Sequence, residues 1–410
     1  MKSKFTFTIQ SLLGIAVLGL VSCSSQGYGY IDKTGKLAIS PRFGNASSFS
    51  EGMAGVAIGN KGGYINKTGK LVIFPTIGAV ETFPFSNGLA PVLINGQWGH
   101  MDKTGKLVIS PFFDEAANFA PKLVELNVRN QYQSRALVNT QPALFQNVRY
   151  LGHIPYFSSG LAAVVQGNRW GYIDTKGKVA IPLQFGEATN FSEELASVKF
   201  GKCWGYINKK GKVVIPPKYH YAYSFSEGIA GVQIGSRWGY INKTGQVVYS
   251  QQSNFIPLSS FSEGLAVFQS NNLYGYINPT GKVVIPPRFQ EAQSFSQGLA
   301  LVQVNNQYGY IDKTGKIIIP LQFTAAQSFK EGRAAVLLTD GWSYIDLQGN
   351  IITKTRFKYA GSFSEGLAVV RTSGEVIRPP TGQKIQRAIP PKSQEKSLKY
   401  CNELLEVDKS

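Results

Sequence analysis

The chain has 410 residues, a formal net charge of +18 and a sequence pI near 9.6. Hydrophobic residues make up 43% and aromatic residues 12%, enough to bury a core, which excludes an intrinsically disordered chain. The positive charge predicts attraction to anionic surfaces such as lipid headgroups, envelope polysaccharides or nucleic acid.

The N-terminal residues have the form of an export signal. Two lysines precede an apolar stretch over about residues 12–21, which is too short to cross a membrane as a helix. The sequence Leu20-Val21-Ser22-Cys23 resembles the lipobox of bacterial lipoproteins. The resemblance implies removal of residues 1–22 and lipidation of Cys23, and Ser24 favours sorting to the outer membrane. An ordinary cleaved secretory signal with a coincidental cysteine is the alternative.

A repeat with a period of 34 to 36 residues follows. One of its marks is a glycine that follows Trp or Tyr in most units. It recurs at Gly29, Gly63, Gly99, Gly171, Gly205, Gly239, Gly275 and Gly309, and Ser343 takes the last place. The gap between Gly99 and Gly171 is twice the period, and segments like Phe-Ser-Glu-Gly-Leu-Ala begin at ten phenylalanines from Phe49 to Phe363. Both observations predict about ten units.

Residues 170–182 show how one unit is built. Trp170 begins a predicted strand, Asp174–Gly177 form a turn, and a returning strand ends at Pro182. The glycine beside the tryptophan is expected to permit close approach of the next unit. Further on, Phe289, Ala292 and Phe295 are spaced by three residues, which predicts a single helical or 3₁₀ turn before a third strand.

These features together resemble the bacterial WG-repeat family, over residues 27 to about 376. The residues that carry the resemblance are Trp98 and Gly99, Trp170 and Gly171, Trp204 and Gly205, and Trp238 and Gly239, with the turn and the Phe-Ser-Glu-Gly-Leu-Ala segment. The slot before the glycine departs from Trp at Tyr28, Gly62, Tyr274 and Tyr308. The biochemical role of most members is unknown, so the resemblance implies a shape more than a reaction.

We expect an all-β array of about ten three-stranded antiparallel units over residues 23–376, stacked as an open superhelical solenoid. A closed β-propeller is the alternative, although propeller blades usually have four strands and number four to eight. The fourth unit, at about 129–156, lacks the glycine turn. It is either a specialised site or the product of sequence drift. Residues 377–410 are expected to form a proline-rich linker and a short capping helix.

Lysines gather at the turns, and in a stacked array they would form a basic ridge. They are Lys33, Lys36, Lys67, Lys70, Lys103, Lys106, Lys176, Lys178, Lys209, Lys212, Lys243, Lys282, Lys313 and Lys316. Glutamates recur in the Phe-Ser-Glu-Gly segments and are expected on a different edge, which would make the protein electrically two-sided. The ridge is predicted to bind a polyanion or an acidic partner. The alternative is a solvated edge that discourages strand pairing.

Other candidate sites have simpler explanations. The repeated tryptophans are expected to pack between units, with stacking on sugars as the alternative. Each turn offers one carboxylate or amide, too few oxygens for calcium. Cysteine and histidine show no metal-ligand spacing, and Cys203 and Cys401 are expected to be unpaired thiols.

The sequence therefore predicts a lipid-anchored envelope protein, in the outer membrane, that binds a protein or an anionic polymer. It shows no nucleophile elbow, phosphate loop or carboxylate pair, so we expect no catalysis and no cofactor. Export argues against a nucleic-acid partner. The alternatives are a carbohydrate-binding or cell-wall-binding repeat protein and an unrecognised envelope hydrolase.

Overall fold

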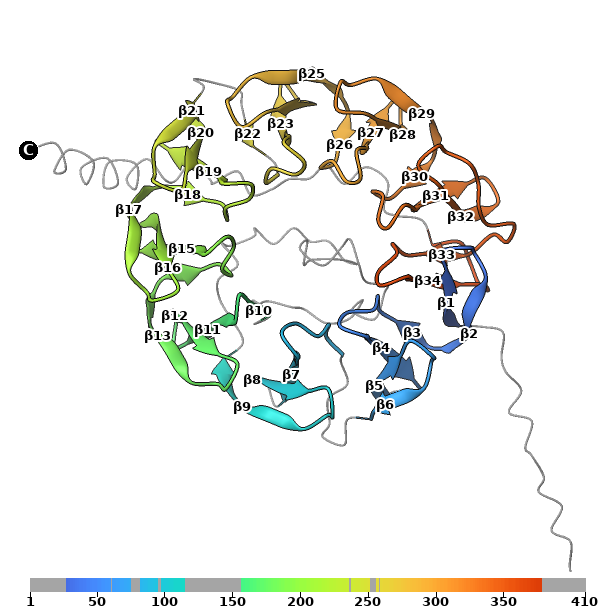
Figure 1. Ribbon diagram of the computed structural model, residues 1–410, viewed down its shortest axis with the longest axis horizontal. Helices are drawn as coiled ribbons and strands as arrows, with labels where there is room; N and C mark the ends of the chain where they lie inside the picture. The colour runs from blue at the N-terminus through green and yellow to red at the C-terminus, as the bar shows by residue number, and fades with distance from the viewer. Residues whose placement is uncertain are drawn as a thin grey trace, which may run out of the picture.

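The computed structural model of the protein describes residues 27–59, 61–74, 82–94, 97–114, 156–235, 237–250, 256–257 and 259–377. These residues form strands and turns and contain no helix. Their strands make nine small antiparallel sheets, arranged as the blades of a closed ring (Figure 1). The all-β class and the alternative of a β-propeller are confirmed, and the open superhelical array is wrong.

The described blades follow one another in chain order, and most have four strands. Blades 1 to 3 contain β1 (Tyr28–Asp32), β2 (Leu37–Phe43), β33 (Tyr359–Ala360) and β34 (Leu367–Arg371); β3 (Asn45–Ala46), β4 (Met53–Ile58), β5 (Lys61–Asn66) and β6 (Leu71–Ile73); and β7 (Leu89–Ile94), β8 (Gln97–Asp102) and β9 (Leu107–Asp114). Blades 4 to 6 contain β10 (Phe157–Ser158), β11 (Leu161–Gln166), β12 (Arg169–Asp174) and β13 (Val179–Phe185); β14 (Glu187–Ala188), β15 (Leu195–Phe200), β16 (Cys203–Asn208) and β17 (Val213–Tyr219); and β18 (Tyr221–Ala222), β19 (Ile229–Ile234), β20 (Arg237–Asn242) and β21 (Val247–Ser250). Blades 7 to 9 contain β22 (Ile256–Pro257), β23 (Ala266–Ser270), β24 (Leu273–Ile277) and β25 (Val283–Phe289); β26 (Glu291–Ala292), β27 (Ala300–Val304), β28 (Gln307–Ile311) and β29 (Ile317–Phe323); and β30 (Ala325–Ala326), β31 (Ala334–Leu338) and β32 (Gly341–Ile345).

Blade 1 closes the ring because it is built from both ends of the repeat region. Strand β1 pairs with β34 through five residues, from Tyr28 opposite Arg371 to Asp32 opposite Leu367. The repeat region thus begins with the two outer strands of a blade and ends with its two inner strands. Pairing them leaves no terminal unit to be capped, which is why the array closes and does not end in open edges.

The ring passes directly from blade 3 to blade 4. The Ser86 hydroxyl donates a hydrogen bond of 2.7 Å to the carbonyl of Phe157, and the His100 and Phe157 rings lie 4.9 Å apart. Blades 3 and 4 are therefore neighbours, and the described residues form nine blades, where about ten units, with a fourth at about 129–156, were predicted. Almost all of that unit lies outside the described residues, as do the predicted signal peptide and the tail from 378.

Neighbouring blades share a core made by the tyrosine of one repeat and the phenylalanine of the next. Tyr206 is fully buried, its ring lies 4.8 Å from Phe225, and its hydroxyl donates to the carbonyl of Tyr223. Equivalent contacts recur between most described blades, including Tyr344 of blade 9 and Phe363 of blade 1. The buried hydroxyl has an acceptor and so avoids the cost of an unpaired polar group. Because both its ring and its hydroxyl contact the next blade, each such tyrosine stabilises the packing of two blades.

The predicted helical turn is wrong. Phe289 ends the outer strand β25, Glu291–Ala292 form the innermost strand of the next blade, and Phe295 follows in an irregular segment. All three apolar side chains enter the same core cluster. The spacing of three residues therefore arises because the chain crosses from one blade to the next above a shared core, and not from a helix.

The glycine of the Trp-Gly pair is required by the close packing of strands within its own blade. A Cβ on Gly205 would lie 2.7 Å from the Ile215 carbonyl oxygen and 2.8 Å from the Pro217 nitrogen, both in the outer strand of the same sheet. The register shifts at this point, so the glycine makes room for a β-bulge. The expectation that it permits approach of the next unit is wrong.

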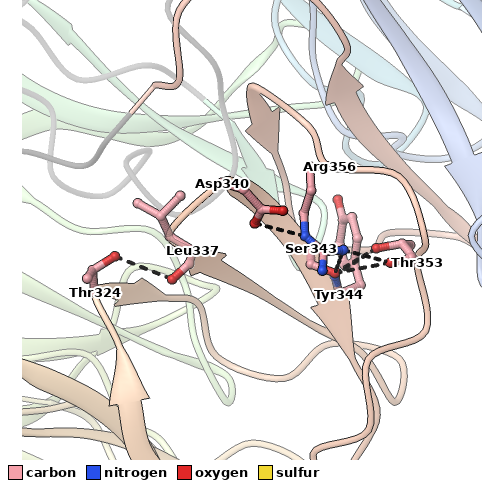
Figure 2. A network of polar contacts seen from close by, with 7 residues as sticks. All are labelled: Thr324, Leu337, Asp340, Ser343, Tyr344, Thr353 and Arg356. Carbon is pink, nitrogen blue, oxygen red and sulfur yellow. Dashed lines mark hydrogen bonds and ion pairs between the residues drawn. The ribbon is translucent and has the colours of Figure 1, made fainter.

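Blade 9 replaces this arrangement with a polar network, shown in Figure 2. The hydroxyls of Ser343 and Thr353 lie 2.8 Å apart, and Arg356 forms an ion pair of 3.0 Å with Asp340. Isolated bridges, and not a regular outer strand, continue the sheet beyond β32. A serine fits in the glycine slot because the bulged outer strand is missing there.

Candidate interaction faces of the ring

The antiparallel order of the strands divides the ring into two faces. In blade 5, Leu195 pairs with Asn208, so the hairpin at Glu193–Glu194 lies beside the turn at Asn208–Lys212. The opposite ends of these strands meet where Phe200 pairs with Cys203. We call the side with the hairpins and Asp/Asn turns the turn face. The side with the connections between second and third strands is the loop face.

Each hairpin on the turn face holds a residue in a strained conformation. Glu331 and Gly332 have φ angles of 52° and 79°, and the equivalent glutamates at other hairpins also have positive φ. Asparagine or glycine tolerates this region better than glutamate does. The choice of glutamate must therefore have a reason outside the hairpin itself.

That reason is a contact with the next blade. The Glu331 carboxylate accepts a hydrogen bond of 2.9 Å from the Gly366 N–H and lies 2.9 Å from the Lys33 ammonium. Both partners belong to blade 1, so this contact also joins the two ends of the repeat region. We call it the glutamate clasp. The same contact with a lysine recurs in four other places, as the ion pairs Lys67–Glu365, Lys103–Glu51, Lys243–Glu193 and Lys313–Glu263.

The clasp lowers the pKa of the carboxyl groups of Glu331 and Glu193. Partial burial raises the pKa of Glu331, but the Lys33 ammonium and the N–H groups of Gly366 and Glu365 outweigh it, so the pKa is lowered overall. The pKa of Glu193 is lowered in the same way by Lys243 and Gly228, against the effect of burial. These groups stay ionised in mildly acidic solution.

The prediction of an electrically two-sided protein is wrong. The predicted ridge residues Lys33, Lys67, Lys103 and Lys243 lie on the same face as the hairpin glutamates and form ion pairs with them. The physical reason is the antiparallel sheet, which returns the chain to the same face after two strands. The sequence places the two charges in different motifs, and only the pairing brings them together.

A second set of ridge lysines, which follow the turn glycine, is exposed at the outer rim of the turn face. Among the described residues none of them forms an ion pair. They are Lys36, Lys70, Lys106, Lys178, Lys212, Lys282 and Lys316. Each directly precedes the outermost strand of its blade, and we call this set the outer lysine ring.

Apolar side chains stand beside these lysines. Val213 and Val214 after Lys212 are 39% and 41% exposed, and Ile317 after Lys316 is 47% exposed. The same two positions are apolar in every described blade. They lie on an edge strand with unpaired backbone groups, where lysines hinder pairing with another chain. The rim thus combines cationic and apolar groups in all blades but two, where Gln246 and Asn350 replace the lysine.

The turns are closed by their own side chains. Oδ1 of Asp32 accepts hydrogen bonds from the Thr34 N–H and hydroxyl and from the Lys36 N–H. The Thr34 hydroxyl, with the two backbone donors and Lys36, lowers the pKa of Asp32 against the effect of burial, which raises it. This confirms the predicted turn capping. Within the described residues no cluster of three or more His, Cys, Asp or Glu could hold a metal ion.

The repeated tryptophans pack between neighbouring blades, as predicted, since Trp170 and Trp204 lie in core clusters formed by residues of two blades. Trp98, Trp170 and Trp204 are 2%, 5% and 6% exposed, and Trp238 is half-buried. Their partner glycines, Gly99, Gly171, Gly205 and Gly239, are buried too. The three buried indoles have no free face on which a sugar could stack.

One aromatic cluster on the loop face was missed by sequence reasoning. Tyr221 at the inner end of blade 6 is 40% exposed, and its ring lies 5.0 Å from Tyr223 and 5.8 Å from Trp238. The Tyr223 and Trp238 rings are stacked at 5.6 Å. The corresponding inner position is Glu187 in blade 5 and Glu291 in blade 8. That departure from the repeat is the signal that could have identified the cluster.

Cys203 is disulfide-bonded and fully buried at the start of β16. The prediction that it is an unpaired thiol is wrong. The chain has two other cysteines, Cys23 and Cys401, and both lie outside the described residues. No helix in the described part of the chain is long and apolar enough to cross a membrane.

The family model of the WG containing repeat matches the chain nine times and covers most of it. The matches are residues 28–61, 63–98, 98–120, 170–202, 204–238, 238–274, 274–308, 308–342 and 342–375. The chain is a WG-repeat protein. Each match begins in the third strand of a blade, at or next to the Trp slot. The WG-repeat protein therefore has half a blade at each end of its repeats, and pairing of β1 with β34 joins the two halves.

The ring is also similar to solved structures at low identity. A eukaryotic initiation factor is 13% identical, with a TM-score of 0.49, over 80% of this chain and 95% of that chain. BamB from Moraxella catarrhalis is 11% identical, with a TM-score of 0.37, over 84% and 91%. The dehydrogenase NirN in complex with DHE is 11% identical, with a TM-score of 0.38, over 73% and 74%. No curated protein matches the WG-repeat protein.

Proposed function

We propose that this WG-repeat protein is an envelope lipoprotein, anchored through Cys23, whose ring is a non-catalytic scaffold that binds a protein or an anionic polymer. The outer lysine ring carries the proposal. Its cations have no carboxylate partner among the described residues, unlike the lysines of the clasp. Apolar residues beside each lysine favour an acidic protein, because a glycan would leave them in water.

The absence of catalysis is part of the proposal. The carboxyl groups with lowered pKa, such as Asp32 and Glu331, are occupied by turn capping and by the clasp. They recur in several blades as structural contacts. A scaffold needs a stable surface with repeated contacts, and the closed ring provides one.

Replacement of six outer lysines by glutamine tests the binding face. The variant carries Lys36, Lys70, Lys106, Lys178, Lys212 and Lys316 changed to Gln, and the control carries Lys61, Lys202 and Lys218 on the loop face changed to Gln. Partners are captured from crosslinked envelopes and identified by mass spectrometry. We expect the six-lysine variant to lose the partner and the control to keep it. Equal recovery from both would contradict the proposal, and loss of an anionic glycan in place of a protein would identify the polymer.

The disulfide supports export, because such bonds persist in oxidising compartments. It also offers a test of the anchor. A lipidated Cys23 has no sulfur left for a disulfide, so peptide mapping without reduction should find Cys203 joined to Cys401 and acyl mass on the Cys23 peptide. A Cys23–Cys203 peptide would contradict lipidation.

The aromatic cluster favours a second candidate function, binding of a carbohydrate. Tyr221 offers an exposed ring on the same face as the exposed Arg237, and the two groups suit stacking and hydrogen bonding to a sugar. Tyr221→Ala should then weaken retention on isolated cell-wall polysaccharide, whereas Tyr249→Ala, in the outer strand of the same blade, should not. Equal retention of both would remove this candidate.

A further inference from the structure

The path of the chain shows which face of the ring the anchor reaches. Tyr28, the first residue of β1, pairs with Phe43 at the end of β2 and with Arg371 at the end of β34. The turn that follows Asp32 lies at the other end of β1. The chain therefore joins the ring at the loop face, through Gly27.

The distance from Cys23 to the ring is short. Four peptide steps separate Cys23 from Gly27, and each spans at most about 3.6 Å, so the anchor lies within about 14 Å of Gly27. Strand β1 alone extends about 17 Å from the loop face to the turn face. The anchor therefore lies nearest the loop face, and to meet a bilayer against the turn face it would have to run back along nearly the whole height of the blade.

The loop face has the charge that an anionic bilayer would attract. The connections between second and third strands expose Lys61, Arg169, Lys202 and Arg237. Three described acids at this face have partners: Asp340 is ion-paired with Arg356 at 3.0 Å and Glu187 with Lys199 at 2.6 Å, and Glu291 accepts a hydrogen bond from the Tyr308 hydroxyl. The turn face also carries cations without a carboxylate partner, those of the outer lysine ring, so the position of the anchor, and not charge alone, distinguishes the two faces.

Apolar side chains project at the same ends of the strands. Ile58 at the end of β4 and Leu273 at the start of β24 are 40% and 37% exposed. The phenyl ring of Phe74 is 44% exposed, and the Lys61 ammonium lies 5.6 Å from its centre. Cations beside exposed apolar and aromatic groups are typical of surfaces that rest in a headgroup layer.

We propose that the loop face rests on the anionic bilayer that holds the lipid anchor, with the turn face directed into the aqueous compartment. This orientation rests on the proposed lipidation of Cys23. It deepens the proposed function, because it leaves the outer lysine ring free to bind a partner away from the membrane.

Lysine acylation measured by mass spectrometry tests the orientation. The full lipidated protein is placed in vesicles of phosphatidylethanolamine and phosphatidylglycerol and, for reference, in neutral detergent micelles. Labelling of Lys61 and Lys202 should fall at least about threefold in vesicles, whereas Lys70, Lys178 and Lys316 should be labelled as in micelles. Protection of the turn-face lysines, or equal labelling on both faces, would overturn the orientation.

Charge-reversed variants provide a matched control in the lipidated protein. Lys61→Glu with Arg169→Glu should restore much of the labelling of Lys202 in vesicles, and Lys70→Glu with Lys178→Glu should leave it protected. The reverse pattern would overturn the proposal. A protein without acyl mass at Cys23 would refute the proposed anchor and the orientation together, while an acylated protein with an unprotected loop face refutes the orientation alone.

Discussion

At the scale of the residue, the hairpin glutamates such as Glu331 show how a locally unfavourable choice is retained. A glutamate at positive φ is less stable than glycine or asparagine in the same hairpin. Its carboxylate offsets this cost by binding an N–H and an ammonium group of the next blade. The hairpin of blade 8 uses Gln297, whose amide oxygen accepts a bond of 2.7 Å from Gly332, so the hydrogen bond alone suffices there.

Substitution of Glu331 separates the hydrogen bond from the charge. Glu331→Ala should lower the free energy of unfolding by about 1–2 kcal/mol, because it removes both contacts to blade 1. Glu331→Gln should lower it by less, since the amide can still accept from Gly366 as Gln297 does from Gly332. The midpoint of urea denaturation measures both effects. Equal losses would mean that the hydrogen bond contributes nothing.

At the scale of the element, the turn between the third and fourth strands packs against the preceding blade. Gly211 has a φ of 77°, and a Cβ there would lie 3.1 Å from Cγ2 of Ile181 in blade 4. Gly228 in a hairpin has a φ of 78° but has no neighbour within 4 Å of that position. The repeat thus uses glycine for conformation alone in the hairpin and for conformation and packing in the turn.

Alanine at these two glycines distinguishes the two requirements. Gly228→Ala should cost about 1–2 kcal/mol for the left-handed conformation alone. Gly211→Ala should cost roughly 1 kcal/mol or more beyond that, because Ile181 must move in a packed interface. Thermal unfolding of the two variants provides the comparison. A Gly228→Ala variant as unstable as Gly211→Ala would show that packing on Ile181 is unimportant.

At the scale of the whole molecule, closure makes every blade an internal blade. Glu365 of blade 1 binds the Gly52 N–H and Ser364 donates to the Phe49 carbonyl, the same contacts that join consecutive blades elsewhere. The contacts that fasten the ring are therefore distributed around it. A condition that weakens one clasp weakens its equivalents at the same time.

Acid is such a condition. Glu193, Glu331, Asp32, Asp102, Asp312 and Asp346 all have a lowered pKa in the folded protein. Because the unfolded chain binds protons at the ordinary values, 4.5 for Glu and 3.8 for Asp, stability should be constant above about pH 5 and fall below it. Thermal unfolding between pH 7 and 3 measures this, and Glu193→Gln with Glu331→Gln should flatten the fall. An unchanged slope would show that the clasps do not contribute.

The repeat period, the strand–turn–strand order and the turn capping by Asp32 and its equivalents follow from the sequence alone, because they depend on contacts within a few residues. The sequence by itself also determined the family and the basic rim. Only the tertiary structure decided that the array closes, that hairpin glutamates meet turn lysines, and that Gly205 serves a bulge in its own sheet. These features depend on pairing between distant residues, such as Tyr28 with Arg371, and a local pattern holds no information about which distant strand completes a sheet.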